Sequence, residues 1–449
     1  MRKFPPGFHF GAATAAYQIE GSPSADGKGE SIWDRFTHAP GTVKGATTGD
    51  VACDSYKRWR DDIALLREMN LNSYRFSIAW PRVQPDGRGA FEPRGLDHYA
   101  RFVEALLEAG IRPLPTLYHW DLPQGLEDAG GWANRDTASR FAEYASVVVT
   151  TLGDRVGTWA TFNEPWVFTR FGYLDGIHAP GVSDPDLYLR ATHTVNLAHA
   201  LATKAIKAHD AGLRVGCVYS VSPAVPATES DDDRMAAEAF HAYVNLWFAT
   251  PALHGRYPAQ AVAGPLPLVR MGWQDGDEEL LRAPLDWAGI NYYFHRVVAA
   301  APATAEPLAL PFMTVERREF DLTEFGWPVN PDGLRDILLR MYDDLGRVPL
   351  EVTENGCSYH HCPDERGFVD DSERIEYLHD HLVALLDASD RGVDVRGYHH
   401  WTLIDNFEWA EGFTQRFGLV YLDVRTGERT IKSSGRFFAK IALGNRDFP

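Results

Sequence analysis

Short apolar runs alternate with longer segments of helical periodicity along the whole chain. A short apolar run with β-branched residues, such as 349–353, suits a buried strand. In the longer segment 54–69, Trp59, Ile63 and Leu66 recur at helical spacing and share one face. The same alternation predicts strands at 8–14, 72–78, 112–118, 158–163, 214–220, 286–293, 349–353 and 395–403. It predicts helices at 54–69, 94–109, 136–152, 186–211, 231–254, 332–345, 372–388 and 431–442.

These eight strand–helix units follow one another without a break in composition. Strands that alternate with helices indicate a parallel sheet, and eight such units predict an α/β fold, a closed (β/α)8 TIM barrel. We therefore expect a single catalytic domain over residues 1–449, with long loops after the strands forming the active-site pocket. The longest irregular segments, 298–331 and 405–428, are expected to be functional loops, because long loops in compact domains usually are.

Two of the predicted strands lead into a glutamate. The run 349–353 is followed directly by Glu354, and the run 158–163 ends in Asn163, which Glu164 follows. Active sites of such barrels lie at the carboxyl ends of the strands, so the two glutamates form a candidate pair of catalytic carboxylates. Taken alone, each is better explained as a solvated strand-end residue or the neighbour of a helix N-cap.

Polar and aromatic side chains gather at the ends of the other predicted strands. This set comprises Gln18, Arg75, His119, Trp120, Asn291, Tyr293, Trp401, Glu408 and Trp409. Indole rings stack on the apolar faces of a sugar, while amides, carboxylates and an imidazole bind its hydroxyl groups. A pair of carboxylates in such a pocket provides the catalytic groups for glycoside hydrolysis. A phosphate-binding loop is not indicated, because Gly11-Ala12-Ala13 lacks both the P-loop lysine and the Rossmann spacing.

Composition and charge limit the kinds of partner that the protein can bind. Hydrophobic residues make up 45% of the chain, enough for a large core, and 44 basic against 62 acidic residues give a net charge of −18. This balance argues against nucleic acid or an anionic membrane as a partner. Four cysteines do not form a disulfide framework, and no apolar run resembles a signal peptide or a membrane span. We expect a cytoplasmic protein, and the sequence leaves open whether it forms a homo-oligomer.

Three further motifs carry a simpler explanation than chemistry. The segment 357–362 contains two Cys and two His, but it lacks the paired spacing of a zinc site, so a plain loop with free thiols is favoured over a structural metal. His178 is expected to be structural, because no nucleophile pairs with it in the motif. The acidic run 231–233 fits a helix N-terminus better than a calcium site.

On these motifs the chain resembles family 1 glycoside hydrolases, the retaining β-glucosidase and β-galactosidase family, nearly from end to end. The matching stretches are 12–21, 74–80, 119–124, 161–165, 176–181, 289–293, 353–356 and 401–423. The resemblance implies that Glu354 of Thr-Glu-Asn-Gly is the nucleophile and Glu164 of Asn-Glu-Pro the acid/base. It places Arg75, Asn291 and Tyr293 around the nucleophile, and substrate-binding roles at Gln18, His119, Trp120, Asn163, Trp327, Trp401, Glu408, Trp409 and Phe417.

Two places depart from the family pattern. Pro328 and Asn330, beside the aglycone-side Trp327, are unusual, and so is the pair His399-His400. These departures leave the catalytic pattern intact and bear on the preference for the leaving group.

The activity implied by the resemblance is that of a retaining β-glycosidase, with β-glucosidase favoured. Its expected substrates are β-glucosides, cellobiose or short oligosaccharides, with β-galactosyl and β-fucosyl groups also accepted, and neither metal nor organic cofactor is needed. The intact Glu408-Trp409 pair favours a non-phosphorylated sugar, and Glu164 stands where the thioglucosidase branch has Gln.

A retaining mechanism sets two physical expectations. The carboxyl groups of Glu354 and Glu164 should lie about 5–5.5 Å apart, against roughly 6.5–9.5 Å for inversion. Arg75 and Tyr293 should favour the charged form of Glu354, while that charge and partial burial should raise the pKa of Glu164.

Alternatives remain at the level of sequence. A sugar-binding protein on an inactive scaffold is disfavoured because both glutamates are present. An enzyme that mainly transfers glycosyl groups to acceptors other than water would use the same residues and stays open. Metal-dependent hydrolysis in the same barrel would make activity sensitive to chelators.

Overall fold

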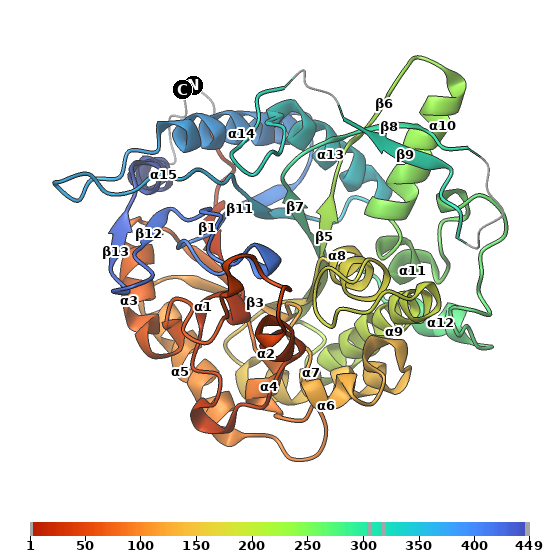
Figure 1. Cartoon of the computed structure of the whole chain (residues 1–449), viewed down its shortest axis with the longest axis horizontal. Helices are drawn as coiled ribbons and strands as arrows, with labels where there is room; N and C mark the ends of the chain where they lie inside the picture. The colour runs from red at the N-terminus through yellow and green to blue at the C-terminus, as the bar shows by residue number, and fades with distance from the viewer. Residues whose placement is uncertain (1–2, 303–307, 317–319, 445–449) are drawn as a thin grey trace.

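The computed structural model describes residues 3–302, 308–316 and 320–444, and within them eight parallel strands close into a barrel (Figure 1). Their order around the barrel is β1 (His9–Ala13), β11 (Val395–Trp401), β10 (Leu350–Asn355), β7 (Trp287–Tyr292), β5 (Arg214–Val221), β4 (Thr158–Asn163), β3 (Arg112–Tyr118) and β2 (Ser73–Ser77). The predicted (β/α)8 barrel is confirmed, and the strands lie close to their predicted positions. Residues 303–307 and 317–319 of the predicted loop 298–331 lie outside the described residues.

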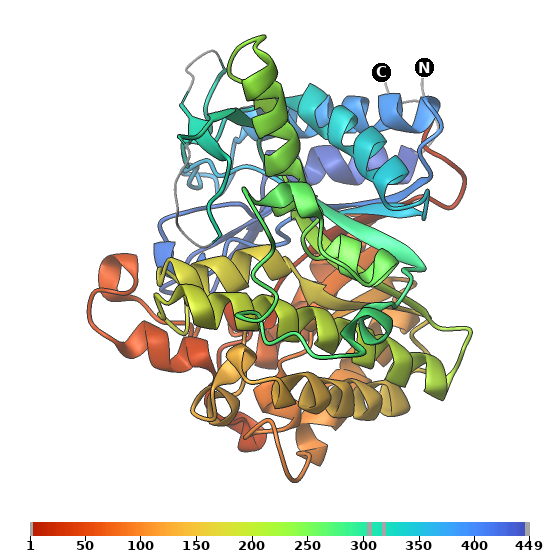
Figure 2. The same cartoon turned by 90° about the vertical axis from the view of Figure 1, so that its right-hand side faces the viewer.

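Helices surround the barrel on its outer side (Figures 1 and 2). They include α3 (Ser55–Glu68), α5 (Pro93–Glu108), α7 (Asp136–Leu152), α9 (Pro185–His209), α10 (Asp231–Phe240), α13 (Pro331–Asp344), α14 (Ser372–Asp390) and α15 (Ser433–Gly444). Helix α5 illustrates the rule: Pro93 suits its first turn, and Phe102 on its buried face contacts the rings of Tyr74 and Phe76 of β2 at 6.1 and 4.9 Å. No helix in the described part of the chain is long and apolar enough to cross a membrane.

The hydrophobic core is divided by the barrel wall. The larger part lies between the strands and the surrounding helices. A smaller, separate cluster consists of Leu114, Ala160, Val218 and Trp287, one residue from each of four neighbouring strands, and all four are fully buried. The indole of Trp287 donates to the carbonyl of Trp159 at 3.2 Å, so this large side chain is buried with its polar atom satisfied.

One predicted helix is wrong as a single element. The segment 231–254 forms α10, then a π-helical turn at His241–Asn245, and then α11 (Ala249–His254). Asn245 explains the interruption, because its side chain accepts from the backbone N–H of Ser222 and donates to the Ser222 carbonyl, both at 3.0 Å. These bonds tie the helix to the loop that follows β5, which periodicity alone does not reveal.

The two segments predicted to be irregular contain short strands, so that prediction is partly wrong. Strands β6 (Ala224–Pro226), β8 (Arg296–Ala300) and β9 (Phe312–Val315) form a small sheet outside the barrel. Strands β12 (Val420–Leu422) and β13 (Arg429–Ile431) pair as an antiparallel ribbon. Strands this short carry little period-two signal, which is why the sequence pattern did not distinguish them from loop.

Candidate active site

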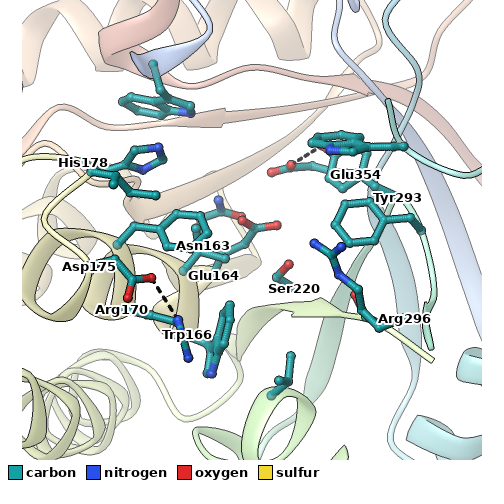
Figure 3. Close-up of a pocket in the computed structure, with 18 of the residues that line it drawn as sticks. Asn163, Glu164, Trp166, Arg170, Asp175, His178, Ser220, Tyr293, Arg296 and Glu354 are labelled. Atoms are coloured by element: carbon teal, nitrogen blue, oxygen red, sulfur yellow. Dashed lines mark hydrogen bonds and ion pairs between the residues drawn. The ribbon is translucent and has the colours of Figure 1, made fainter. Parts of the chain in front are cut away.

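A cavity of about 860 Å³ lies at the carboxyl ends of the barrel strands and is lined by both candidate glutamates. The part of the cavity around the two glutamates is called the inner end. Its residues are buried or half-buried, namely His119, Asn163, Glu164, Tyr293, Glu354, Trp401, Glu408 and Trp409. A second part of the cavity wall is called the outer end. Its residues are half-buried or exposed, namely Trp166, Phe171, Phe294, Arg296, Met313, Phe325 and Trp327. Figure 3 shows Glu164 and Glu354 projecting into the same space from different walls.

Glu354 lies near the end of β10 and is only 3% exposed. The Arg75 guanidinium donates to one carboxylate oxygen at 2.5 Å, and the Tyr293 hydroxyl donates to the other at 2.7 Å. Burial raises the pKa of Glu354, while Arg75 and Tyr293 lower it, as expected from the sequence. The net shift is upward because the removal of water around the carboxylate outweighs both donors.

Glu164 follows the last residue of β4 and precedes α8 (Pro165–Thr169). Its backbone has a φ of 49°, a left-handed conformation that turns the chain sharply between strand and helix. The side chain is 6% exposed, and the Asn291 amide donates to its carboxyl oxygen at 2.9 Å. Burial and the charge of Glu354 raise the pKa of Glu164 to about 8, so burial is more complete than the sequence suggested.

Asn163 joins the surroundings of the two glutamates. Its side-chain oxygen accepts from Arg75 at 2.7 Å and from Asn291 at 3.0 Å, and its nitrogen lies 2.9 Å from Nε2 of His119. Burial, followed by the Arg75 charge, lowers the pKa of His119 well below its usual value, so this imidazole is neutral. Arg75 and Asn291 do not line the cavity themselves, and they act on it through the residues that do.

Gln18 does not line the cavity itself, but its amide contacts Glu408 of the inner end. The Gln18 amide donates to Glu408 at 3.2 Å and to the carbonyl of Phe407 at 2.9 Å. Among the described residues, the buried side-chain oxygen of Gln18 and Nδ1 of His119 have no hydrogen-bond partner. Burial and the charge of Glu354 raise the pKa of Glu408 to about 8. Unpartnered buried polar atoms beside a cavity are suited to bind the hydroxyl groups of a ligand.

The tryptophans predicted to bind substrate occupy both ends. Trp401 and Trp409 are 3% and 4% exposed at the inner end. Trp120 also lines the cavity, but its ring N–H is already used by the Asn163 carbonyl at 3.0 Å, so it offers only its ring. Trp327 lies at the outer end, 5.7 Å from the ring of Phe417.

The unusual pair His399-His400 lies behind the cavity. His399 is hydrogen-bonded to Ser73 at 2.9 Å, and His400 to the carbonyl of Phe417 at 3.2 Å. Both are fully buried, and burial lowers the pKa of each to about 3. These histidines are therefore neutral packing residues, and His400 helps to hold the segment that carries Phe417.

Several cavity residues escaped the sequence analysis. Trp166 and Phe294 follow predicted site residues within two positions, so their place in the chain was a usable signal. Arg296 lies on β8 beyond the strand end, and Met313 lies on β9. Phe240 lies at the end of α10 and also reaches the cavity, and no local pattern marks these last three positions.

The motifs set aside at the sequence level show no chemistry of their own. Cys357 is buried and Cys362 exposed, and both are free thiols. In the described residues, no group of three or more His, Cys, Asp or Glu side chains is arranged to hold a metal ion. His178 lines the cavity, and burial lowers its pKa to about 3, so it forms part of the wall as a neutral ring.

Comparisons with known proteins agree with this geometry. The model of the family described as glycosyl hydrolase family 1 matches residues 1–446. β-Glucosidase A of Thermotoga maritima is 41% identical over 446 residues, covering 99% of each chain. A bifunctional β-D-glucosidase/β-D-fucosidase of Bifidobacterium breve is 43% identical and covers 98% of each chain. Structures of the family 1 β-glucosidase of T. maritima in complex with isofagomine lactam and with galacto-hydroximolactam match with a TM-score of 0.93, 41% identity and 99% coverage of both chains.

Proposed function

Because the chain belongs to glycosyl hydrolase family 1, and is thereby a retaining glycoside hydrolase, we propose that it acts as a β-glucosidase. It removes terminal, non-reducing β-D-glucosyl groups from aryl or alkyl glucosides, cellobiose or short oligosaccharides, and also accepts β-galactosyl and β-fucosyl groups. Relatives named β-glucosidase over 99% of the chain support the glucosyl preference. The relative named as both β-D-glucosidase and β-D-fucosidase supports the broader range.

One observation carries the assignment of roles. Both oxygens of Glu354 accept hydrogen bonds from their own donors, Arg75 and Tyr293. The side chains that hydrogen-bond to Glu164, by contrast, are the neutral groups of Asn291 and Ser220. This difference favours ionisation of Glu354 first, and the charge of Glu354 then raises the pKa of Glu164. Glu354 is therefore the nucleophile and Glu164 the general acid in the first step.

In that first step, the Glu354 carboxylate attacks the anomeric carbon while Glu164 gives its proton to the departing glycosidic oxygen. The bond from the anomeric carbon to that oxygen breaks, and an ester between glycosyl group and Glu354 forms. Formation of the ester removes the negative charge of Glu354. Since that charge is one cause of the raised pKa of Glu164, the pKa of Glu164 falls in the intermediate.

In the second step, Glu164 is ionised and acts as the general base. It takes a proton from a water molecule, which attacks the anomeric carbon and releases Glu354. Two inversions give net retention, and the double displacement predicts a carboxyl separation of about 5–5.5 Å. An alcohol or sugar that replaces this water gives a transfer product, so product analysis with added acceptor measures that branch.

The remaining residues of the inner end, together with Gln18, bind the glycosyl group. Gln18, His119, Asn163 and Glu408 supply polar atoms for its hydroxyl groups, and Trp401 and Trp409 supply flat apolar faces. The polar atoms of Gln18 and His119 that have no partner in the described residues support this assignment. The side chains of Trp327 and Phe417 contact the leaving group.

We also propose that residues 1–449 work as one catalytic domain, supported by barrel strands drawn from residues 9 to 401. Free thiols at Cys53, Cys217, Cys357 and Cys362 support a reducing, cytoplasmic location. Size-exclusion chromatography with light scattering decides between a monomer and a homo-oligomer.

The test is a set of initial rates on aryl β-glucoside, β-galactoside and β-fucoside. We expect the glucoside to be cleaved with the highest kcat/KM, and a product whose anomeric configuration, followed by NMR, is β at first. Turnover with an initially α-configured product would contradict the double displacement. Absence of turnover on all three glycosides by folded protein would contradict the glucosidase assignment.

A further inference from the structure

The outer end of the cavity holds a cation, Arg296, with which no carboxylate of the described residues forms an ion pair. We propose that Arg296 binds a carboxylate carried by an aromatic leaving group, so that the preferred substrates include β-glucosides of aromatic acids. The inference rests on the proposed function and adds the chemical class of the leaving group.

Arg296 is placed to meet such a group. It is an exposed residue at the start of β8, three positions after Tyr293, and it lines the same cavity as both glutamates. Its guanidinium carbon lies 4.3 Å from the centre of the Phe294 ring, a contact that supports the side chain from one face. Figure 3 shows the guanidinium turned into the cavity, in the direction of Ser220 and Tyr293.

Ion pairs engage four other charged residues of the described cavity wall, namely Arg170, Asp175, Glu354 and Glu411. Arg170, the second arginine of the described lining, donates to Asp175 at 3.0 Å. Glu411 accepts from Lys44 at 2.6 Å, so it leaves little free negative charge. At the inner end, Arg75 compensates Glu354 at 2.5 Å.

Arg296 differs from these groups. Among the described residues, no carboxylate forms an ion pair with its guanidinium, and its N–H groups form no side-chain hydrogen bond. Partial burial of its side chain lowers the pKa of Arg296, and no carboxylate of the described residues acts in the opposite direction. An incoming carboxylate supplies that anion in the bidentate geometry that a guanidinium favours.

The surroundings of Arg296 indicate an aromatic leaving group rather than a second sugar. The outer end consists largely of rings, with Phe294 and Phe325 at 5.1 and 4.4 Å from Trp327. Met313 and Phe312 of β9 extend this apolar wall. The inner end, by contrast, binds hydroxyl groups with amides and carboxylates, and the outer end offers none of that set beside Arg296 in its described residues.

The experiment compares two matched substrates, 4-(carboxymethyl)phenyl β-glucoside and 4-(carbamoylmethyl)phenyl β-glucoside. A methylene group separates the carboxylate or amide from the ring, so the two phenolates leave with similar ease. The measured quantity is the ratio of kcat/KM for the acid to that for the amide, within each protein. This ratio cancels differences in the fraction of active enzyme between variants.

We expect Arg296→Gln to lower this ratio about tenfold, as loss of a charge-assisted bond does. The change should be in KM, with kcat preserved, because the contact exists before the bond breaks. Arg296→Lys keeps the positive charge but loses the bidentate guanidinium geometry, so its acid-to-amide ratio should lie between those of the wild type and Arg296→Gln. Arg60→Gln is the matched control, since Arg60 stacks on Trp59 at 3.9 Å and does not line the cavity.

Three outcomes overturn the assignment of Arg296. They are an equal ratio in wild type and Arg296→Gln, a preference of the wild type for the amide, and a larger loss on cellobiose than on the acid in Arg296→Gln. The last outcome would assign Arg296 to sugar hydroxyl groups. Failure of the wild type on both aryl glucosides, and on simple aryl glycosides, instead overturns the proposed function.

Discussion

The inner and outer ends of the cavity hold their side chains in different ways. At the inner end, Glu354 and Asn163 lie on barrel strands, and their side chains receive hydrogen bonds from Arg75 of a third strand. At the outer end, Phe294 and Trp327 lie beyond the strands, and contact one another ring to ring. One end is fixed by directional bonds between strands and the other by apolar contact between loops.

This difference assigns different tasks to the two ends. Charge that develops during bond cleavage must meet donors fixed to within a fraction of an ångström, which crossed hydrogen bonds between strands provide. Apolar contact is non-directional, so the outer end can accept leaving groups of various shapes. We therefore expect substitutions at the inner end to change the rate for every substrate, and substitutions at the outer end to change the order of preference among substrates.

The largest expected effect is the loss of the nucleophile. Glu354→Gln keeps the size of the side chain but removes its negative charge, so no glycosyl ester forms, and kcat should fall by at least about 10⁴-fold on every glycoside. Initial rates with an aryl β-glucoside measure this. Glu143→Gln, on the exposed face of α7, is the control for loss of a carboxylate. Wild-type rates in Glu354→Gln would show that the inner end is wrongly assigned.

Loss of the acid should be nearly as large, but dependent on the leaving group. Glu164→Gln cannot protonate the glycosidic oxygen, so kcat/KM should fall about 10²–10⁴-fold for a poor leaving group such as a methylphenol. For dinitrophenyl β-glucoside, which leaves without a proton, the fall in kcat/KM should be small. Equal losses on both substrates would contradict the role of Glu164 as general acid.

A pH profile sharpens the comparison within the inner end. The free enzyme needs Glu164 protonated and Glu354 ionised, so kcat/KM should fall as pH rises through about 8, the pKa of Glu164. It should also fall as pH drops through the pKa of Glu354, which burial raises above the usual 4.5. Measurement of kcat/KM against pH on an aryl β-glucoside gives both limbs.

Asn291→Ala tests whether the hydrogen bonds of Asn291 help to set the two pKa values that limit the pH profile. The Asn291 amide lowers the pKa of both glutamates against the larger effect of burial, so its removal should shift both limbs to higher pH. The maximal kcat/KM should fall about tenfold, by the loss of a bond to a charged group. A fall in rate with unmoved limbs would show that Asn291 acts only through packing.

The smallest expected effect concerns the outer end. Trp327→Ala removes a ring that contacts Phe294 and Phe325, and should lower the kcat/KM ratio of aryl to methyl β-glucoside about 2–10-fold. The rate on methyl β-glucoside itself reports on the inner end. A similar loss on both substrates would remove the distinction between the two ends.

The sequence predicted the inner end more completely than the outer end for a physical reason. Glu164, Asn291 and Glu354 lie at or next to the ends of strands, and the strand ends of a closed barrel converge whatever the loops do. Arg296 belongs to a three-stranded sheet of segments distant in the chain, whose pairing no local pattern encodes. The pKa of Glu354 also escaped prediction in its net direction, since the extent of burial depends on the whole assembled wall.

The fold, like the site, was predictable where local sequence patterns determine it and not where distant segments pair. Helices on the outer surface repeat apolar residues at helical spacing, and α5 and α7 lie close to their expected positions. The break after α10 was not predictable, because it depends on the bonds of Asn245 to Ser222, a residue on another element.

The hydrogen bonds of Asn163 determine which ring nitrogen of His119 carries the proton, and so which polar atom is free to bind a sugar hydroxyl. Its oxygen accepts from Arg75 and Asn291, so its nitrogen must donate, and the Nε2 of His119 at 2.9 Å must be the lone-pair nitrogen. The neutral ring of His119 then carries its only proton on Nδ1, a donor that has no partner among the described residues. Gln18 has the opposite polarity, because its amide nitrogen is engaged by Glu408 and its oxygen has no partner among the described residues. His119 thus presents an unused proton and Gln18 an unused lone pair, and a sugar hydroxyl, which is both donor and acceptor, can bond to either.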